Sequence, residues 1–179
     1  MASRNIITII EDGPLQVQGD FRVYNTIGEI VAHEGELMLC RCGASKTKPV
    51  CDGSHTEAGF KDCCVVDKSK DEALEKSSAL IISCRPNGML VAKGPMIIIG
   101  PDGQSKTMRN KAALCRCGAS RNKPFCDVSH KKCDFKDDAL INEASEIPGE
   151  SGAVASELVP ESISESIPES IPDKPTDKQ

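Results

Sequence analysis

The sequence contains the stretch Cys40-Arg-Cys-Gly-Ala-Ser-Lys-Thr-Lys-Pro-Val-Cys-Asp-Gly-Ser-His55, and a similar stretch, Cys115-Arg-Cys-Gly-Ala-Ser-Arg-Asn-Lys-Pro-Phe-Cys-Asp-Val-Ser-His130, follows 75 residues later. Each copy has the spacing C-x-C, then eight residues, then C-x-x-x-H. Three thiolates and one imidazole are a four-ligand set that suits zinc or iron. Phe60-Lys-Asp is also repeated at the same offset, as Phe135-Lys-Asp. The repeat predicts a fold built from two equivalent halves.

The composition limits how such a fold can be held together. The 179 residues include ten cysteines and three histidines, but only 3% of them are aromatic. Few large side chains are available for a core, so bound metal is expected to contribute to stability. No apolar run is long enough to span a bilayer, and the first residues lack the pattern of a signal peptide. We therefore expect a cytoplasmic protein whose cysteines serve metal or redox chemistry, and not a secreted disulfide scaffold.

The chain divides into four segments. We assign residues 1–67 to the first repeat, 68–78 to a charged linker that could include a short helix, 79–139 to the second repeat and 140–179 to an acidic, low-complexity tail. The tail contains nine acidic and two basic side chains and so carries −7, which leaves +2 on the rest of the chain. Its Glu-Ser-Ile-Pro repeats place prolines where a helix would need backbone donors, which predicts disorder.

Strand patterns precede each motif. Alternating or β-branched runs occupy residues 6–10, 15–17, 21–23, 30–33 and 37–39 in the first copy, and 79–84, 89–92, 96–99 and 106–109 in the second. Gly13-Pro14 matches Gly94-Pro95 at an offset of 81, which implies a second copy six residues shorter at this point. Together these patterns predict a β-rich fold with short helices, of a small β-sandwich or β-cap type.

The ligand residues lie within a longer pattern, Cys40-x-Cys42-x-x-Ser45-x-x-x-Pro49-x-Cys51-Asp-Gly-Ser-His55. This pattern resembles the signature of the CDGSH iron–sulfur domain family (mitoNEET-like), and its presence twice resembles the tandem two-motif members. The resemblance implies two pseudo-symmetric repeats and two [2Fe–2S] clusters, with the cysteines of each C-x-C on one iron and the third cysteine and the histidine on the other. The implied cofactor-binding and metal ligands are Cys40, Cys42, Cys51 and His55 in the first repeat and Cys115, Cys117, Cys126 and His130 in the second.

The resemblance implies electron transfer, or the storage and transfer of clusters. The expected partner is a redox protein or an apo iron–sulfur acceptor protein, with no nucleic acid, no membrane and no substrate pocket of an enzyme. Tandem copies make a monomer sufficient. Two alternatives use the same residues, namely a structural zinc-binding interaction module and a redox or nitric-oxide sensor. A visible absorption band that bleaches on reduction separates clusters from zinc.

Several other residues are given simpler interpretations. Val128 stands where the pattern has glycine, and it is strained if the backbone there has a positive φ and fits if φ is negative. The remaining cysteines have no cysteine at the 75-residue offset and are interpreted as buried or incidental thiols, and His33 as structural. Basic residues near the motifs are interpreted first as a solvated face and second as a surface that steers an anionic partner. These cysteines are Cys63, Cys64, Cys84 and Cys133, and the basic residues are Lys46, Lys48, Arg121, Lys123, Lys131 and Lys132.

Overall fold

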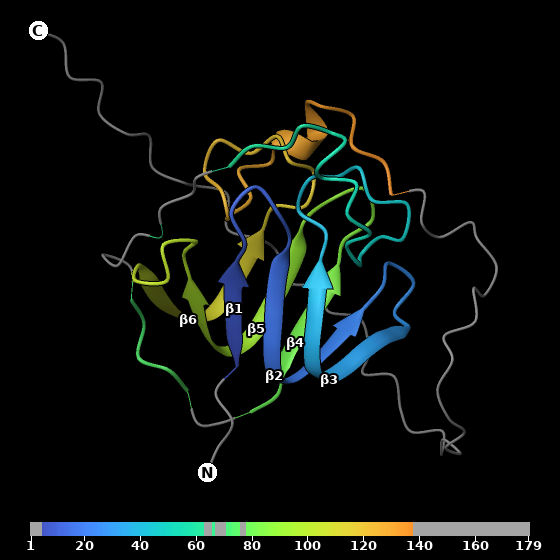
Figure 1. The fold of residues 1–179 in the computed structure, drawn as a ribbon. Helices are drawn as coiled ribbons and strands as arrows, with labels where there is room; N and C mark the ends of the chain where they lie inside the picture. The colour runs from blue at the N-terminus through green and yellow to red at the C-terminus, as the bar shows by residue number, and fades with distance from the viewer. Residues whose placement is uncertain (1–4, 63–65, 67–70, 76–77, 138–179) are drawn as a thin grey trace, which may run out of the picture. The chain divides into compact units, whose positions relative to one another are not determined.

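The structure is a computed structural model, and it describes residues 5–62, 66, 71–75 and 78–137. This part of the chain consists mainly of strands, and the one helix within it is the short 3-10 helix η2, Ser129–Lys131. The strands are β1 (Ile6–Ile9), β2 (Leu15–Tyr24), β3 (Ile30–Leu39), β4 (Leu80–Cys84), β5 (Leu90–Ile99) and β6 (Lys106–Leu114) (Figure 1). The expectation of a β-rich fold with two repeats is confirmed. The tail, residues 140–179, lies outside the described residues.

The two repeats share one barrel-like sheet. Within the first repeat β1 and β2 pair antiparallel, as β4 and β5 do in the second. The repeats are joined by two parallel pairings, β1 with β5 and β2 with β4. Strands β1, β2, β4 and β5 therefore close on themselves, and β3 and β6 extend the sheet from β2 and β5. Each repeat thus contributes its first strand to the sheet of the other.

A glycine in each long strand allows this exchange. Strand β2 pairs with β1 up to Gln18 and with β4 from Phe21, and the break falls at Gly19, whose φ is 120°. Gly94 breaks β5 in the same way, with φ 119°. A Cβ at Gly94 would lie 2.8 Å from the carbonyl oxygen of Ala79, so the crossing chain leaves room only for glycine. Both β2 and β5 can therefore contact three neighbouring strands.

The breaks also correct the sequence alignment of the two halves. Gly94 occupies the place of Gly19, and Gly88 occupies the place of Gly13, because β2 and β5 start and end 75 residues apart. The proposed match of Gly13-Pro14 with Gly94-Pro95 at an offset of 81 is wrong, and the second copy is not shorter there. The error arose because a Gly-Pro pair happens to occur at two different structural positions.

The described part of the linker runs beside β6. Residues 71–75 form no helix. Instead, the amide of Glu72 donates to the carbonyl of Met108, and the amide of Asn110 donates to the Glu72 carboxylate, both at 2.9 Å. The Asn110 side chain donates to the carbonyl of Ala73 at 2.8 Å. These bonds satisfy backbone groups of an edge strand. The other linker residues, 68–70 and 76–77, lie outside the described residues.

Apolar side chains from both repeats fill one core. Buried members come from all six strands and include Ile7, Leu15, Val17, Phe21, Val23, Leu39, Leu80, Ile82, Leu90, Met96, Ile98, Ala112 and Leu114. Asn5 is a buried polar exception that serves both halves. Its Nδ2 donates to the carbonyls of Ser78 and Pro95, and its Oδ1 accepts from the amide of Asp20, each at 3.0 Å. Among the described residues, no helix is long and apolar enough to cross a bilayer.

Candidate metal centres

Each ligand loop begins where the last strand of its repeat ends. Cys40 follows β3 and Cys115 follows β6, and Figure 1 shows both loops beyond the same end of the sheet. The amide of Cys40 donates to the Pro49 carbonyl at 2.8 Å, and that of Cys51 donates to the Met38 carbonyl at 2.9 Å. These bonds fold the loop back so that the third cysteine lies beside the end of the strand. The equivalent bonds of Cys115 and Cys126, both 2.8 Å, repeat the arrangement.

The candidate ligand side chains approach one another in pairs. Cys40 Sγ lies 3.7 Å from Cys42 Sγ, and Cys51 Sγ lies 3.4 Å from His55 Nδ1. The second repeat has the same two distances, Cys115 to Cys117 and Cys126 to His130 Nδ1. In the described part of the chain, no group of three or more His, Cys, Asp or Glu side chains surrounds one ion position. The donors are therefore arranged two by two.

Backbone amides face the sulfur atoms. The amide of Ala44 lies 3.4 Å from Cys42 Sγ, and the amide of Val128 lies 3.3 Å from Cys126 Sγ. Burial raises the pKa of Cys40 and of Cys51, and nearby amides oppose this effect. The free thiols of these residues are therefore protonated near neutral pH, and binding of a metal would release their protons. Amides directed at the sulfurs then stabilise the thiolate form.

In each loop an aspartate carboxylate accepts hydrogen bonds from two backbone amides. The Asp52 carboxylate accepts from the amides of Lys46 at 2.8 Å and Ser54 at 3.0 Å. Hydrogen bonds from Ser54 and Lys46 hold the pKa of Asp52 well below its usual value. Asp127 accepts in the same way from Arg121 and Ser129. Each carboxylate thus ties the chain before the third cysteine to the chain before the histidine.

The two loops touch each other. Gly43 and Gly118 both have positive φ, 82° and 77°. A Cβ on Gly43 would lie 3.0 Å from the carbonyl oxygen of Cys117, and one on Gly118 would lie 2.6 Å from that of Cys42. The ligand loops are therefore in backbone contact across the junction of the repeats, and a side chain at either glycine would separate them.

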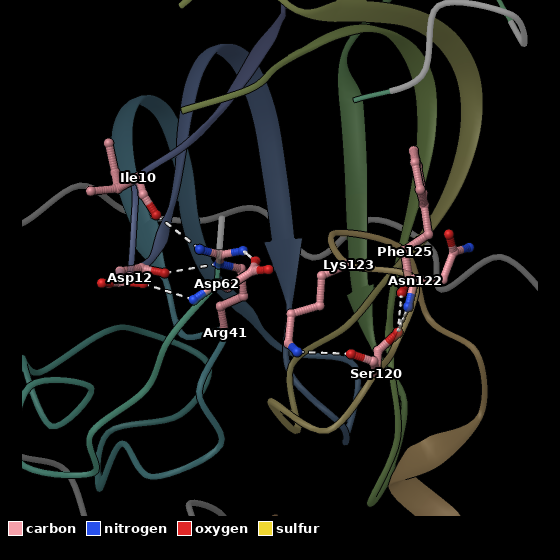
Figure 2. Close-up of polar contacts among 9 residues, drawn as sticks. Ile10, Asp12, Arg41, Asp62, Ser120, Asn122, Lys123 and Phe125 are labelled. Atoms are coloured by element: carbon pink, nitrogen blue, oxygen red, sulfur yellow. Dashed lines mark hydrogen bonds and ion pairs between the residues drawn. The ribbon is translucent and has the colours of Figure 1, made fainter. Parts of the chain in front are cut away.

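Two lysines cross this junction, against expectation. Lys48 donates to the Ser45 carbonyl at 2.7 Å, and its Nζ lies 6.0 Å from the Phe135 ring of the other repeat. Lys123 donates to the Ser120 carbonyl at 2.8 Å (Figure 2), and its Nζ lies 5.9 Å from the Phe60 ring. Both lysines are half-buried and belong to the joint between the loops. The prediction of a solvated face holds for the other four basic residues, Lys46, Arg121, Lys131 and Lys132, which are exposed.

The arginine between the first two cysteines of each loop has a role that was not predicted from the sequence. Arg41 is buried, donates to the carbonyls of Gly13 and Ile10 at 2.8 Å each, and pairs with the Asp62 carboxylate (Figure 2). Its guanidinium lies 5.0 Å from the ring of Phe60. One side chain thus joins the ligand loop to the β1–β2 turn and to the segment that follows His55.

Arg116 performs the same function in the second repeat. It donates to the carbonyls of Gly88 at 2.8 Å and Arg85 at 2.7 Å, and its guanidinium pairs with Asp137 Oδ2 at 2.6 Å. The ring of Phe135 lies 5.3 Å away. The signal was present in the sequence, because the arginine and the Phe-Lys-Asp triplet recur at the same offset as the ligands.

The comparison with protein families agrees with this geometry. The iron-binding zinc finger of CDGSH type matches twice, over residues 12–56 and 87–131, which together make up half of the chain. The chain belongs to the CDGSH family. Its two matches support a tandem member with an iron–sulfur binding role. The matches are 75 residues apart, as the strands are. No curated protein matches the chain.

The remaining cysteines and His33 have no partner among the ligand pairs described above. Cys84 is buried, as predicted, and burial raises its pKa to about 11. Cys133 is exposed and lies 3.8 Å from the His130 carbonyl oxygen. Cys63 and Cys64 fall outside the described residues. His33 is exposed on β3, with Nδ1 3.9 Å from the Glu34 carboxylate.

The backbone of Val128 has a positive φ, which is the strained one of the two cases considered for this residue. Its φ is 69°, in the left-handed region, and the equivalent Gly53 has φ 88°. A β-branched residue at such a φ costs about 1–2 kcal/mol. A Cβ at Gly53 would meet nothing within 4 Å, so the cost of a side chain there arises from the backbone conformation alone.

We expect Val128→Gly to raise the free energy of unfolding by about 1 kcal/mol, since relief of strain exceeds the entropy that glycine adds to the unfolded chain. The matched variant Gly53→Val is expected to lower it by a similar amount. Urea denaturation of the iron-loaded proteins measures both. Equal stability of all three proteins would show that the left-handed conformation is not maintained in solution.

Replacement of the buried Arg116 is expected to lower the stability of the protein strongly. Arg116→Met leaves the Asp137 carboxylate and two carbonyls without their charged partner, so the free energy of unfolding should fall by about 3–5 kcal/mol. The double variant Arg116→Met/Asp137→Leu removes the unpaired charge as well and should lose less. Arg121→Ala, at an exposed position, is the control. A double variant that is no more stable than Arg116→Met would exclude the ion pair as the cause.

Proposed function

We propose that this CDGSH protein holds two [2Fe–2S] clusters and uses them for electron transfer, for cluster storage and transfer, or for both. The ligands would be Cys40, Cys42, Cys51 and His55 for one cluster and Cys115, Cys117, Cys126 and His130 for the other. The proposal describes a cytoplasmic monomer that acts as a carrier and not as an enzyme. Its partner would be a redox protein or an apo iron–sulfur acceptor, with no role for nucleic acid or membrane.

The pairing of the donors is the observation that carries the proposal. A mononuclear zinc site of the Cys3His type brings four donors to one ion. Here each loop presents two cysteine sulfurs 3.7 Å apart and a separate cysteine–imidazole pair 3.4 Å apart. Two donors for each of two metals is the ligand count of a [2Fe–2S] cluster. The donor set therefore fits such a cluster better than it fits a single zinc ion.

A bound cluster would supply one-electron chemistry, and the histidine makes each site distinctive. The ring nitrogen that faces Cys51 is Nδ1 of His55, so Nε2 is available to hold a proton. A neutral imidazole in place of a thiolate removes one negative charge from the site. The potential of the site should then be higher than that of an all-cysteine site. Protonation of Nδ1 would compete with the metal, which makes metal retention dependent on pH.

Metal analysis combined with visible absorbance distinguishes the cluster protein from the two alternatives, the structural zinc module and the redox or nitric-oxide sensor. We expect about four irons and four acid-labile sulfides per purified chain, with a visible absorption band that bleaches on addition of dithionite. Half of these amounts would indicate that one site is empty. A colourless protein with about two zinc ions would favour the structural zinc module. A cluster that bleaches only on exposure to nitric oxide, and not on reduction, would favour the sensor.

Replacement of one ligand tests the role of the histidine. His55→Cys adds a negative charge to the first site, so its reduction potential should fall. The visible absorbance of that site should also survive longer at mildly acidic pH, because no imidazole competes for protons. His130→Cys is the matched variant for the second site, and His33→Ala is the control. If His55→Cys changed neither the potential nor the acid sensitivity, His55 would not be a ligand.

A further inference from the structure

The two sites have closely similar backbones but surfaces of opposite charge. Leaving aside Asp52, Arg41 and Asp62, which have identical counterparts in the second repeat, the charged residues around His55 are Glu11, Asp12, Glu57 and Lys61, whose formal charges sum to −2. At the equivalent positions around His130 the second repeat has Pro86, Asn87, Lys132 and Lys136, and it adds Arg85, Lys131 and Asp134, which gives +3. Arg85, Lys131, Lys132, Asp134 and Lys136 are all exposed, and we call this surface the His130 face.

Hydrogen bonds show that these positions are equivalent in space. Asp12 Oδ1 accepts from the amide of Asp62 at 2.7 Å, and Asn87 Oδ1 accepts from the amide of Asp137 at 2.8 Å. The histidine carbonyl of each repeat accepts from the amide of the following phenylalanine, Phe60 or Phe135. The same framework therefore presents an acidic residue beside one histidine and a neutral one beside the other.

Acidic residues line a depression beside His55. A depression of about 280 Å³ beside His55 is lined by Glu11, Asp12, Thr56, Phe60 and Lys61 among others. The ammonium of Lys61 pairs with Asp12 at 2.7 Å, which leaves the exposed Glu11 and Glu57 to determine the charge presented to a partner. In the His130 face, Lys136 pairs with Asp134 at 2.8 Å. The exposed Arg85, Lys131 and Lys132 therefore determine the charge that this face presents to a partner.

An apolar side chain lies beside the basic residues. Val128, two residues before His130, is 40% exposed and has the strained φ of 69°. Strained residues persist where the surroundings or a function favour them. An exposed apolar contact with a charged rim is the usual composition of a protein interface. The equivalent position next to His55 is Gly53, which offers no side chain.

We propose that the His130 face is the docking surface for an acidic electron-transfer protein, and that the surface with Glu11 and Glu57 beside His55 is not. The inference rests on the proposed electron-transfer function. Complementary charge raises the rate of encounter, and like charge lowers it, so an acidic partner is steered to the second site and away from the first. One chain thereby directs its partner to one of its two sites.

The test uses two protein acceptors of opposite charge. The iron-loaded, dithionite-reduced chain is mixed under anaerobic conditions with oxidised plastocyanin, which is acidic, or with oxidised cytochrome c, which is basic. Stopped-flow absorbance follows the acceptor. Lys131→Glu/Lys132→Glu should lower the rate constant with plastocyanin by about tenfold or more at low ionic strength, and the difference should shrink as salt is added. The rate constant with cytochrome c should not fall.

A matched control separates docking from net charge. Lys93 and Lys111 face each other across β5 and β6, outside the ligand loops. Lys93→Glu/Lys111→Glu changes the net charge by the same amount and should alter the plastocyanin rate by less than about twofold. An equal loss in both double variants, or no loss in either, would overturn the proposal. The proposal would also be overturned if Lys131→Glu/Lys132→Glu weakened binding to anionic lipid vesicles but left the rate with plastocyanin unchanged.

Two further outcomes are distinguishable. Oxidation of the reduced chain by ferricyanide requires no docking, so failure of this reaction in an iron-loaded protein would remove the electron-transfer function itself. The nine acidic residues of segment 140–179 are a second source of negative charge within the chain. If wild type showed no preference for plastocyanin but a chain with the nine tail acids replaced by amides did, the face would belong to the tail and the proposal of an external partner would be overturned.

Discussion

The buried ion pairs of Arg41 and Arg116 hold the candidate metal-binding loops in place. Each arginine stands in the sequence between two candidate ligand cysteines, and its guanidinium is buried and pairs with an aspartate 21 residues later. There it joins three segments that are far apart in the chain, namely the turn before the second strand of the repeat, the ligand loop and the segment after the histidine. Loss of either partner of a buried ion pair leaves an uncompensated charge, so each pair favours the one arrangement of the three segments that keeps it intact.

The contacts between the loops extend this constraint from one site to the other. The phenylalanine that packs on each arginine also receives the lysine of the opposite loop, Lys48 on Phe135 and Lys123 on Phe60. Gly43 and Gly118 bring the backbones of the loops together at the same place. Each centre is therefore positioned in part by residues of the other repeat, and the pair forms a single unit in spite of the linear order of the motifs.

Much of this arrangement could be predicted from the sequence. Strands were expected from alternation, and the ligand residues from their recurrence at one offset, because both signals are local. The strand exchange could not be predicted, since it depends on how Gly19 and Gly94 allow distant strands to cross. The same reason explains the wrong match of Gly13 with Gly94. Arg41 was overlooked, and Lys48 was misjudged because a charged residue in isolation suggests solvent and only its distant partners reveal its burial.

The parallel pairings of β1 with β5 and β2 with β4 have a consequence for how the two centres can diverge. In a two-fold dimer of identical chains, every substitution appears at both sites, so the two surfaces must stay alike. Here the exchanged strands reproduce such symmetry within one polypeptide, while each half is encoded separately. Symmetry is kept in the interior, where the framework requires it, and is broken on the outside, where Glu57 at one centre corresponds to Lys132 at the other.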